Sequence, residues 1–269
     1  MVRPPVVSGR FYPNQPDELS RQVASFCSVP QDSALHRAVA CIVPHAGYKY
    51  SGQVAGAVYA RLELPRRFIL IGPRHYPRGA VQAILSEGAW QTPLGLAEID
   101  TGLAAELKCA TSSLIEDDVA HRDEHAIEVQ IPFLQQLAGE FRFVPIALGP
   151  VQYDALETLG KNMAEVVARQ KDPVLIVASS DMNHYESDAV TRRKDALAIE
   201  RLLALDAHGL YDTVRREGIT MCGYGPAVST LIAANLLGAR RAELVRYATS
   251  GDVSGDRGEV VGYAGIIVE

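Results

Sequence analysis

Short apolar, β-branched segments alternate with longer amphipathic segments along nearly the whole chain. Buried apolar runs of this kind are typical of strands, whereas an apolar repeat of about 3.6 residues is typical of a helix. The pattern predicts strands at residues 38–43, 67–71, 81–85, 141–148, 173–178, 242–249 and 260–268. It predicts helices at residues 54–62, 101–108, 127–137, 156–169, 189–205 and 227–237. This alternation predicts an α/β fold, with a central mostly parallel or mixed sheet flanked by helices.

No linker, low-complexity stretch or repeat divides the pattern, so we expect residues 1–269 to form one domain. A formal net charge of -6 argues against nucleic-acid binding, which needs a basic surface. Four cysteines are scattered without CxxC spacing: Cys27, Cys41, Cys109 and Cys222. This usage is typical of a reducing compartment. Because neither a signal peptide nor a membrane span is evident, we expect a cytoplasmic protein without membrane contact.

A histidine follows each of three predicted strands within a few residues. His45 follows the strand at 38–43, His75 follows FILIG, and His184 follows VLIVASS. One such histidine is typical of a solvent-facing turn. Three at the same kind of position predict a shared site, because ligands bind α/β sheets at the carboxyl ends of the strands. Imidazoles gathered in a cleft are metal ligands or acid/base groups.

A glycine-rich turn, TMCGYGPA, places Cys222 just before a predicted helix. A helix N-terminus favours a thiolate, which is both a nucleophile and a metal ligand. A small buried apolar cysteine explains the same turn equally well, so the turn alone leaves both explanations open. The other three cysteines lie in helical or strand patterns, and we expect them to be packing residues.

Residues 121–125 spell HRDEH, the letters of an inverted zinc-peptidase motif. In such an enzyme His121 and His125 bind zinc from adjacent helical turns, and Glu124 is the base. Here the apolar periodicity begins only at residue 127, so the motif is expected to precede the helix. Glu124 and Glu128 then cap and charge-match the helix start. His125 is expected to face the shared site, and a zinc hydrolase stays an alternative.

Characteristic segments occur in a fixed order along the chain: SGRFYP, PHAGYKYSG, ILIGPRH, EHAIEVQIPFL, SSDMNHY, TMCGYGP and GYAG. Together they resemble the Memo family, whose bacterial and archaeal members are also called AmmeMemoRadiSam system protein B. That family is similar in fold to class III extradiol ring-cleaving dioxygenases, which use non-haem Fe(II). The resemblance implies that His45, His75 and Cys222 hold the metal. It also implies that Asp181 and His184 line the same pocket, with His184 as the acid/base group.

The third metal position departs from the ring-cleaving enzymes, which complete a face of two histidines and one carboxylate. A cysteine at this position is a softer ligand, so Cu or Zn competes with Fe(II). The resemblance implies a metal-dependent redox protein of unknown substrate, with Fe(II) as the first choice of metal. The alternative is a non-enzymatic metal- or peptide-binding protein that retains the cleft. The name of the system implies a radical-SAM protein and an associated small protein as partners.

Overall fold

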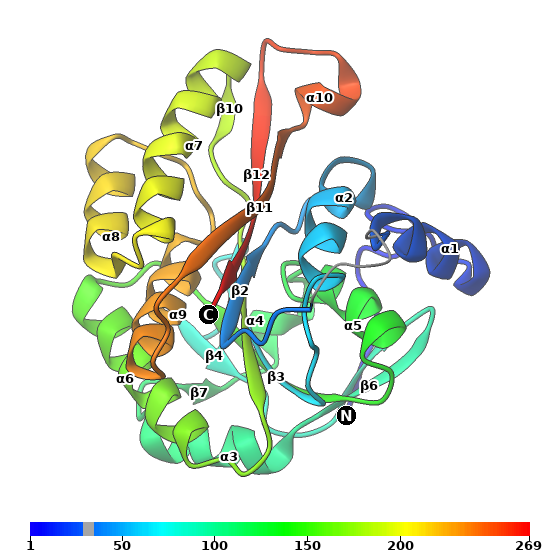
Figure 1. The fold of residues 1–269 in the computed structure, drawn as a ribbon. Coiled ribbons are helices and arrows are strands. Elements are labelled where there is room, and N and C mark those ends of the chain that lie inside the picture. The colour runs from blue at the N-terminus through cyan, green and yellow to red at the C-terminus, as the bar shows by residue number, and fades with distance from the viewer. Residues whose placement is uncertain (29–34) are drawn as a thin grey trace.

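Four parallel strands form the centre of the fold. The computed structural model describes residues 1–28 and 35–269 (Figure 1). Neighbouring strands follow the order β8 (Arg142–Leu148), β3 (Arg67–Pro73), β9 (Val174–Ser179) and β2 (Ala40–Val43). These strands are apolar along almost their whole length, as expected for a sheet covered on both faces.

Further strands extend the centre on both sides. Beside β2 lies the antiparallel β12 (Val260–Val268), which pairs with β10 (His184–Glu186) and β11 (Ala242–Thr249). Beyond β8 lie β6 (Gly95–Ile99), β5 (Ala89–Thr92) and β1 (Val2–Arg3). In addition, β4 (Gln82–Ile84) pairs with β8, and β7 (Ile115–Glu116) pairs with β4. Within the described ranges the 12 strands form one sheet with parallel and antiparallel pairs. The expected α/β fold with a mixed sheet is therefore confirmed.

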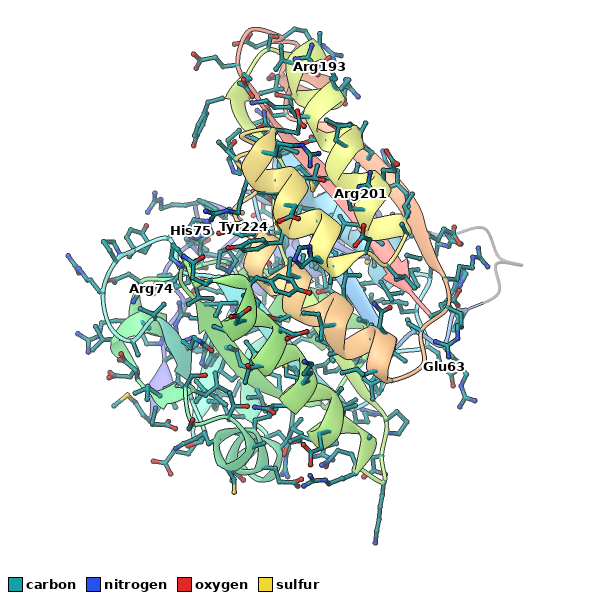
Figure 2. All side chains as sticks on the ribbon, turned by 90° about the vertical axis from the view of Figure 1, so that its left-hand side faces the viewer. Glu63, Arg74, His75, Arg193, Arg201 and Tyr224 are labelled. Carbon is teal, nitrogen blue, oxygen red and sulfur yellow. The ribbon has the colours of Figure 1, made fainter. Side chains whose placement is uncertain are left out.

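Helices cover both faces of this sheet. One layer contains α3 (Thr101–Ala110), α6 (Tyr153–Ala168), α7 (Asp188–Leu203), α8 (Ala207–Arg216) and α9 (Tyr224–Leu236); Figure 2 looks onto α6 to α9. The opposite layer contains α1 (Pro16–Phe26), α2 (Tyr48–Tyr59), the 3₁₀ turn η1 (Glu128–Gln130) and α5 (Ile131–Leu137). Two short helices, α4 (Val119–Arg122) and α10 (Gly251–Ser254), lie in connecting segments. No helix of the described residues is long and apolar enough to cross a membrane.

Alternate side chains of the central strands point to opposite faces of the sheet and pack into two separate cores. Ile69 and Ile71 of β3 join the core beneath α6 and α9, whereas Phe68 and Leu70 join the core beneath α2 and α5. This is the two-residue period of a strand, expressed on a sheet with both faces buried. The two cores fix the positions of β2, β3 and β9. Because these strands are parallel neighbours, the carboxyl ends of the three strands lie along one edge of the sheet.

The elements differ from the sequence-based expectation in identifiable places. Helix α2 begins at Tyr48 rather than near residue 54. Its first turns bury Tyr48 and Ser51, which are not aliphatic, so the apolar periodicity of the sequence does not reveal them. The segment expected as one helix at 127–137 is a 3₁₀ turn followed by a short α-helix. Helices α1 and α8 and the β5–β6 hairpin were not predicted.

Candidate metal centre

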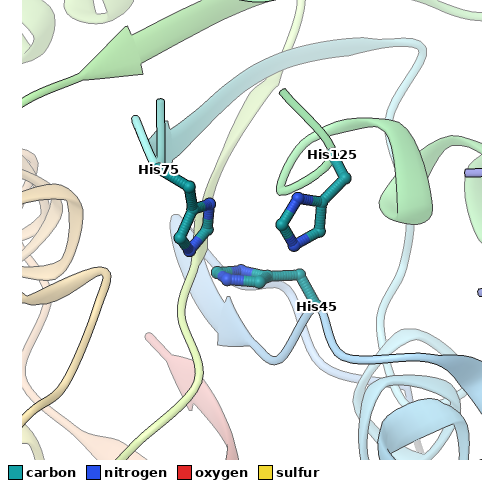
Figure 3. A group of neighbouring side chains, drawn as sticks. All are labelled: His45, His75 and His125. Atoms are coloured by element: carbon teal, nitrogen blue, oxygen red, sulfur yellow. The ribbon is translucent and has the colours of Figure 1, made fainter. Parts of the chain in front are cut away.

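Three imidazoles from three separate loops gather at the carboxyl edge of the sheet. His45 follows β2, His75 follows β3, and His125 lies between α4 and η1. One ligand atom from each ring lies within 4.8 Å of the other two, and Figure 3 shows the rings around one small space. The ring centroids are 5.2 Å apart for His45–His75, 5.6 Å for His45–His125 and 4.7 Å for His75–His125. Among the described residues this is the group close enough to share one metal ion.

The three rings line a cavity of about 560 Å³. Its other polar walls are Asp181, His184, Thr220 and Cys222, and its apolar walls include the aromatic rings of Phe11 and Tyr185. The sequence predicted that His45, His75, Cys222 and His184 converge on one cleft at this edge, and the structure brings all four to it. Their chemical roles stay predictions.

Ser179 determines which nitrogen of the His45 ring carries the hydrogen. Its hydroxyl donates to the carbonyl oxygen of Ala126 at 2.6 Å and accepts from the Gln130 amide at 2.9 Å. The hydroxyl has one hydrogen, so it must also accept from His45 Nδ1, which lies 2.9 Å away. The lone pair of His45 Nε2 then faces the cavity. Burial, followed by the nearby charge of His75, lowers the pKa of His45 well below 6.5, so the ring is neutral at neutral pH.

Glu124 holds His75 from behind. Its Oε1 accepts from His75 Nδ1 at 2.9 Å, and its Oε2 accepts from the His75 backbone N–H at 2.6 Å. The same carboxylate caps the backbone N–H groups of His125 and Ala126 at 2.8 and 2.9 Å. Burial acts to lower the pKa of His75, but the hydrogen bond and charge of Glu124 outweigh it and raise that pKa. A carboxylate behind a ligating imidazole fixes the ring and makes it a stronger ligand.

His125 completes the group of three. Its Nδ1 lies 3.4 Å from Glu124 Oε1, and Phe11 packs edge-on against its ring with centroids 4.9 Å apart. Burial, followed by the charge of His45, lowers the pKa of His125 to about 4. The ring is therefore neutral and available as a ligand at neutral pH. The sequence predicted that His125 faces the site, but gave no signal that it lies within reach of the same ion.

Cys222 contacts His45 and the loop after β9. Its Sγ lies 3.2 Å from His45 Nε2 and accepts from the Asp181 backbone N–H at 3.3 Å. A side chain on Gly223 would overlap the Ser179 carbonyl and Ser180, so glycine permits this close approach. Cys222 lies outside the group whose ligand atoms are all mutually close, and its role as the third ligand stays a prediction.

Of the two explanations that the sequence leaves open for Cys222, the structure favours the buried thiol in the metal-free protein. Burial, followed by the charge of Asp181, raises the pKa of Cys222 well above 9.0. The metal-free sulfur therefore carries a proton. Asp181 is itself buried, and its Oδ1 accepts from the His45 backbone N–H at 2.7 Å. Burial outweighs this hydrogen bond and raises the pKa of the Asp181 carboxyl.

The HRDEH segment does not form a zinc-peptidase site. Helix α4 contains His121 but ends at Arg122, before Glu124 and His125, so the expectation that the motif precedes the next helix is confirmed. The His121 ring is buried against Trp90, and within the described part of the chain neither ring nitrogen has a hydrogen-bond partner. Only Glu124 caps the following segment.

The expected capping role of Glu128 is wrong, because its carboxylate turns to the N-terminal strand. It pairs with Arg3 at 2.7 Å and accepts the backbone N–H groups of Val6 and Val7. Glu128 is fully buried, so this contact ties the first residues of the chain to the segment that carries His125.

A family profile described as Memo-like protein matches residues 3–267. This chain belongs to the Memo family. A MEMO1 family protein of Methanosarcina barkeri is 42% identical over 270 residues and covers 100% of both chains. A MEMO1 family protein of Methanopyrus kandleri is 40% identical over 280 residues and covers 99% of both. The crystal structure of an uncharacterized protein from Escherichia coli K12 shares the fold, with a TM-score of 0.57 at 12% identity, covering 86% of this chain and 100% of that one.

The residues of this Memo-family chain fit a transition-metal ion. His45 and His75 each have Nδ1 occupied by an acceptor behind the ring, which leaves Nε2 for a metal. His125 is neutral and close to both. Imidazole suits iron, copper and zinc, and the sulfur beside His45 adds a soft donor.

Proposed function

We propose that this protein is a metal-dependent redox protein, with Fe(II) as the first choice of metal and Cu or Zn as alternatives. The observation that carries the proposal is the convergence of His45, His75 and His125 on one cavity at the carboxyl edge of the sheet. The similarity of the Memo family to class III extradiol dioxygenases supports iron. The sulfur of Cys222 beside His45 keeps copper and zinc as competitors.

Each side chain has a distinct task in this proposal. The imidazoles of His45, His75 and His125 hold the ion, and Cys222 adds the sulfur ligand when metal binding displaces the thiol proton. A bound iron or copper ion supplies one-electron redox chemistry and Lewis acidity. Asp181 orients His45 through its backbone N–H, at 2.7 Å.

His184 is the proton acceptor in this proposal. Its Nδ1 donates to the carbonyl oxygen of Thr220 at 2.8 Å, so its Nε2 keeps a lone pair on the wall of the cavity. Phe11 and Tyr185 form the apolar part of that wall. A bound substrate would therefore meet a proton acceptor in a partly dehydrated space.

Anaerobic loading with Fe(II), Cu(I) or Zn(II), followed by elemental analysis, tests the metal site. We expect one ion per chain in the wild type, loss of that ion in His75→Ala, and retention in the matched control His121→Ala. We also expect the iron or copper form to show a reversible one-electron redox titration. Equal metal loss in both variants would revive the zinc-hydrolase alternative.

A wild type that binds none of the three metals would favour the non-enzymatic alternative, in which the cleft binds a peptide.

The proposed association with a radical-SAM protein and a small partner is a separate question. Copurification of the three proteins expressed together tests it, and the absence of a complex at micromolar concentrations would count against it.

A further inference from the structure

The His184 ring and backbone are both held by one residue, Thr220, which also lines the cavity. The ring Nδ1 lies 2.8 Å from the Thr220 carbonyl oxygen, and the His184 backbone N–H donates to the Thr220 hydroxyl at 2.7 Å. A carbonyl oxygen only accepts, so Nδ1 must carry the hydrogen. The contact therefore selects the Nδ1–H tautomer and leaves Nε2 unprotonated in a neutral ring.

Thr220 is in turn held by the side chain of Asn183. The amide oxygen of Asn183 accepts from the Thr220 backbone N–H at 3.0 Å and from its hydroxyl at 3.2 Å. The amide nitrogen donates to Glu186 at 2.7 Å, and the Asn183 backbone N–H donates to Asp195 at 2.9 Å. Asn183 is fully buried, and a buried polar network with its hydrogen bonds satisfied is rigid.

The neighbouring backbone shows that this arrangement overrides local conformational preference. Tyr185, directly after His184, has φ 61°, in the left-handed region that residues other than glycine rarely adopt. Its side chain is 73% exposed, so packing of the ring does not explain the conformation. The pairing of β10 with β12 also shifts register between His184 and Glu186. A strained backbone conformation persists only where surrounding contacts hold it in place, and such conformations cluster at functional sites.

We propose that Asn183 and Thr220 are positioning residues that lock His184 as its Nδ1–H tautomer and keep Nε2 in the cavity as a proton acceptor. We call the hydrogen bonds by which Asn183 and Thr220 hold His184 the clamp. The inference rests on the proposed function, because His184 is the proton acceptor of that site. Asn183 lies behind the cavity wall, and Thr220 lines the cavity beside His184, so both act here through the histidine that they hold.

Two-bond ¹H–¹⁵N correlation spectra of the metal-free protein test the clamp at a pH where His184 is neutral. The protein has 7 histidines, so the His184 signals are assigned by their loss in His184→Gln. We expect the Nδ1–H tautomer to be favoured by about fivefold or more, as one net hydrogen bond provides. Thr220→Val should reduce this ratio by about threefold or more, and Thr220→Ser, which keeps the hydroxyl, should restore it.

Thr230→Val is the matched control, because Thr230 is also fully buried but its hydroxyl has no partner within the described ranges. It should leave the His184 tautomer unchanged. A wild-type ring in the Nε2–H form, an unchanged ratio in Thr220→Val, or an equal change in Thr230→Val would overturn the proposal. Zinc affinity, measured separately on the same samples, reports on the metal site, so a failure of the proposed function is distinguishable from a failure of the clamp.

Discussion

Replacing Glu124 by glutamine removes the negative charge behind His75 and one of the two acceptor oxygens. The carboxylate receives four hydrogen bonds, from His75 Nδ1 and from the backbone N–H groups of His75, His125 and Ala126. Every partner is a donor, and a glutamine amide presents its own N–H₂ group to one side. At least one donor must then face another donor inside the protein. The most favourable orientation turns the amide nitrogen toward the His75 backbone and releases that contact.

The expected magnitude follows from the pKa of the Glu124 carboxyl. Burial acts to raise this pKa, but the hydrogen bond and charge of His75, together with the charge of His125, lower it from 4.5 to about 2. That difference corresponds to about 3 kcal/mol in favour of the folded carboxylate. Because the folded pKa is depressed, this stability is present above about pH 4.5 and is lost as the pH falls toward 2.

Glu124→Gln should therefore lower the free energy of unfolding at pH 7 by about 2–3 kcal/mol and flatten its dependence on pH between 4.5 and 2. It should also weaken zinc binding by roughly 10- to 100-fold, because a neutral amide in place of the carboxylate makes the His75 imidazole a weaker ligand. Urea denaturation across the pH range and competitive zinc titration measure the two effects.

Glu128→Gln is the matched control for this variant. Its carboxylate is equally buried and accepts several hydrogen bonds, but none of them comes from the three histidines of the cluster. It should lower stability and leave zinc affinity within about threefold. Equal zinc affinity in the wild type and in Glu124→Gln would refute the reasoning.

Three further outcomes follow from the site and its surroundings. Tyr185→Gly should be about 1 kcal/mol more stable than Tyr185→Ala in urea denaturation, because glycine adopts φ 61° without strain; equal stabilities would contradict this. Iodoacetamide mapped by mass spectrometry should label the exposed Cys109 before Cys222, whose raised pKa keeps it a thiol, and added metal should slow only Cys222. Apparent zinc affinity should rise with pH through and above 6.5, because the raised pKa of His75 makes metal compete with a proton; a flat profile from about pH 6 to 8 would contradict that assignment.

The sequence predicted the central strands well because each is an uninterrupted apolar run, but sheet order and register depend on contacts between distant segments. Helix α1 carries start signals that apolar periodicity alone misses, namely Pro16 at its first position and acidic residues in its first turn. Helix α8 begins at the cap residue Asp206, whose carboxylate accepts from the Gly209 N–H. Signals at the helix start, together with periodicity, therefore indicate both helices.

The site was predictable where it depends on strand ends and unpredictable where it depends on loop packing. His45, His75 and His184 share a position after parallel strands, and the sequence shows that directly. His125 lies in the loop before η1, where Glu124 caps its backbone N–H, and no strand end marks that position in the sequence. The protonation of Cys222 also depends on burial and on a carboxyl group distant in sequence.

X-ray absorption of the zinc-loaded protein tests the central claim most directly, because it reports the ligands around the ion itself. We expect three imidazole nitrogens at about 2.0–2.1 Å, with the multiple-scattering pattern of imidazole rings. A sulfur shell at about 2.3 Å, lost in Cys222→Ser, would place Cys222 beside the three histidines as a ligand. A shell of oxygen atoms without imidazole scattering would contradict the claim that His45, His75 and His125 hold the metal.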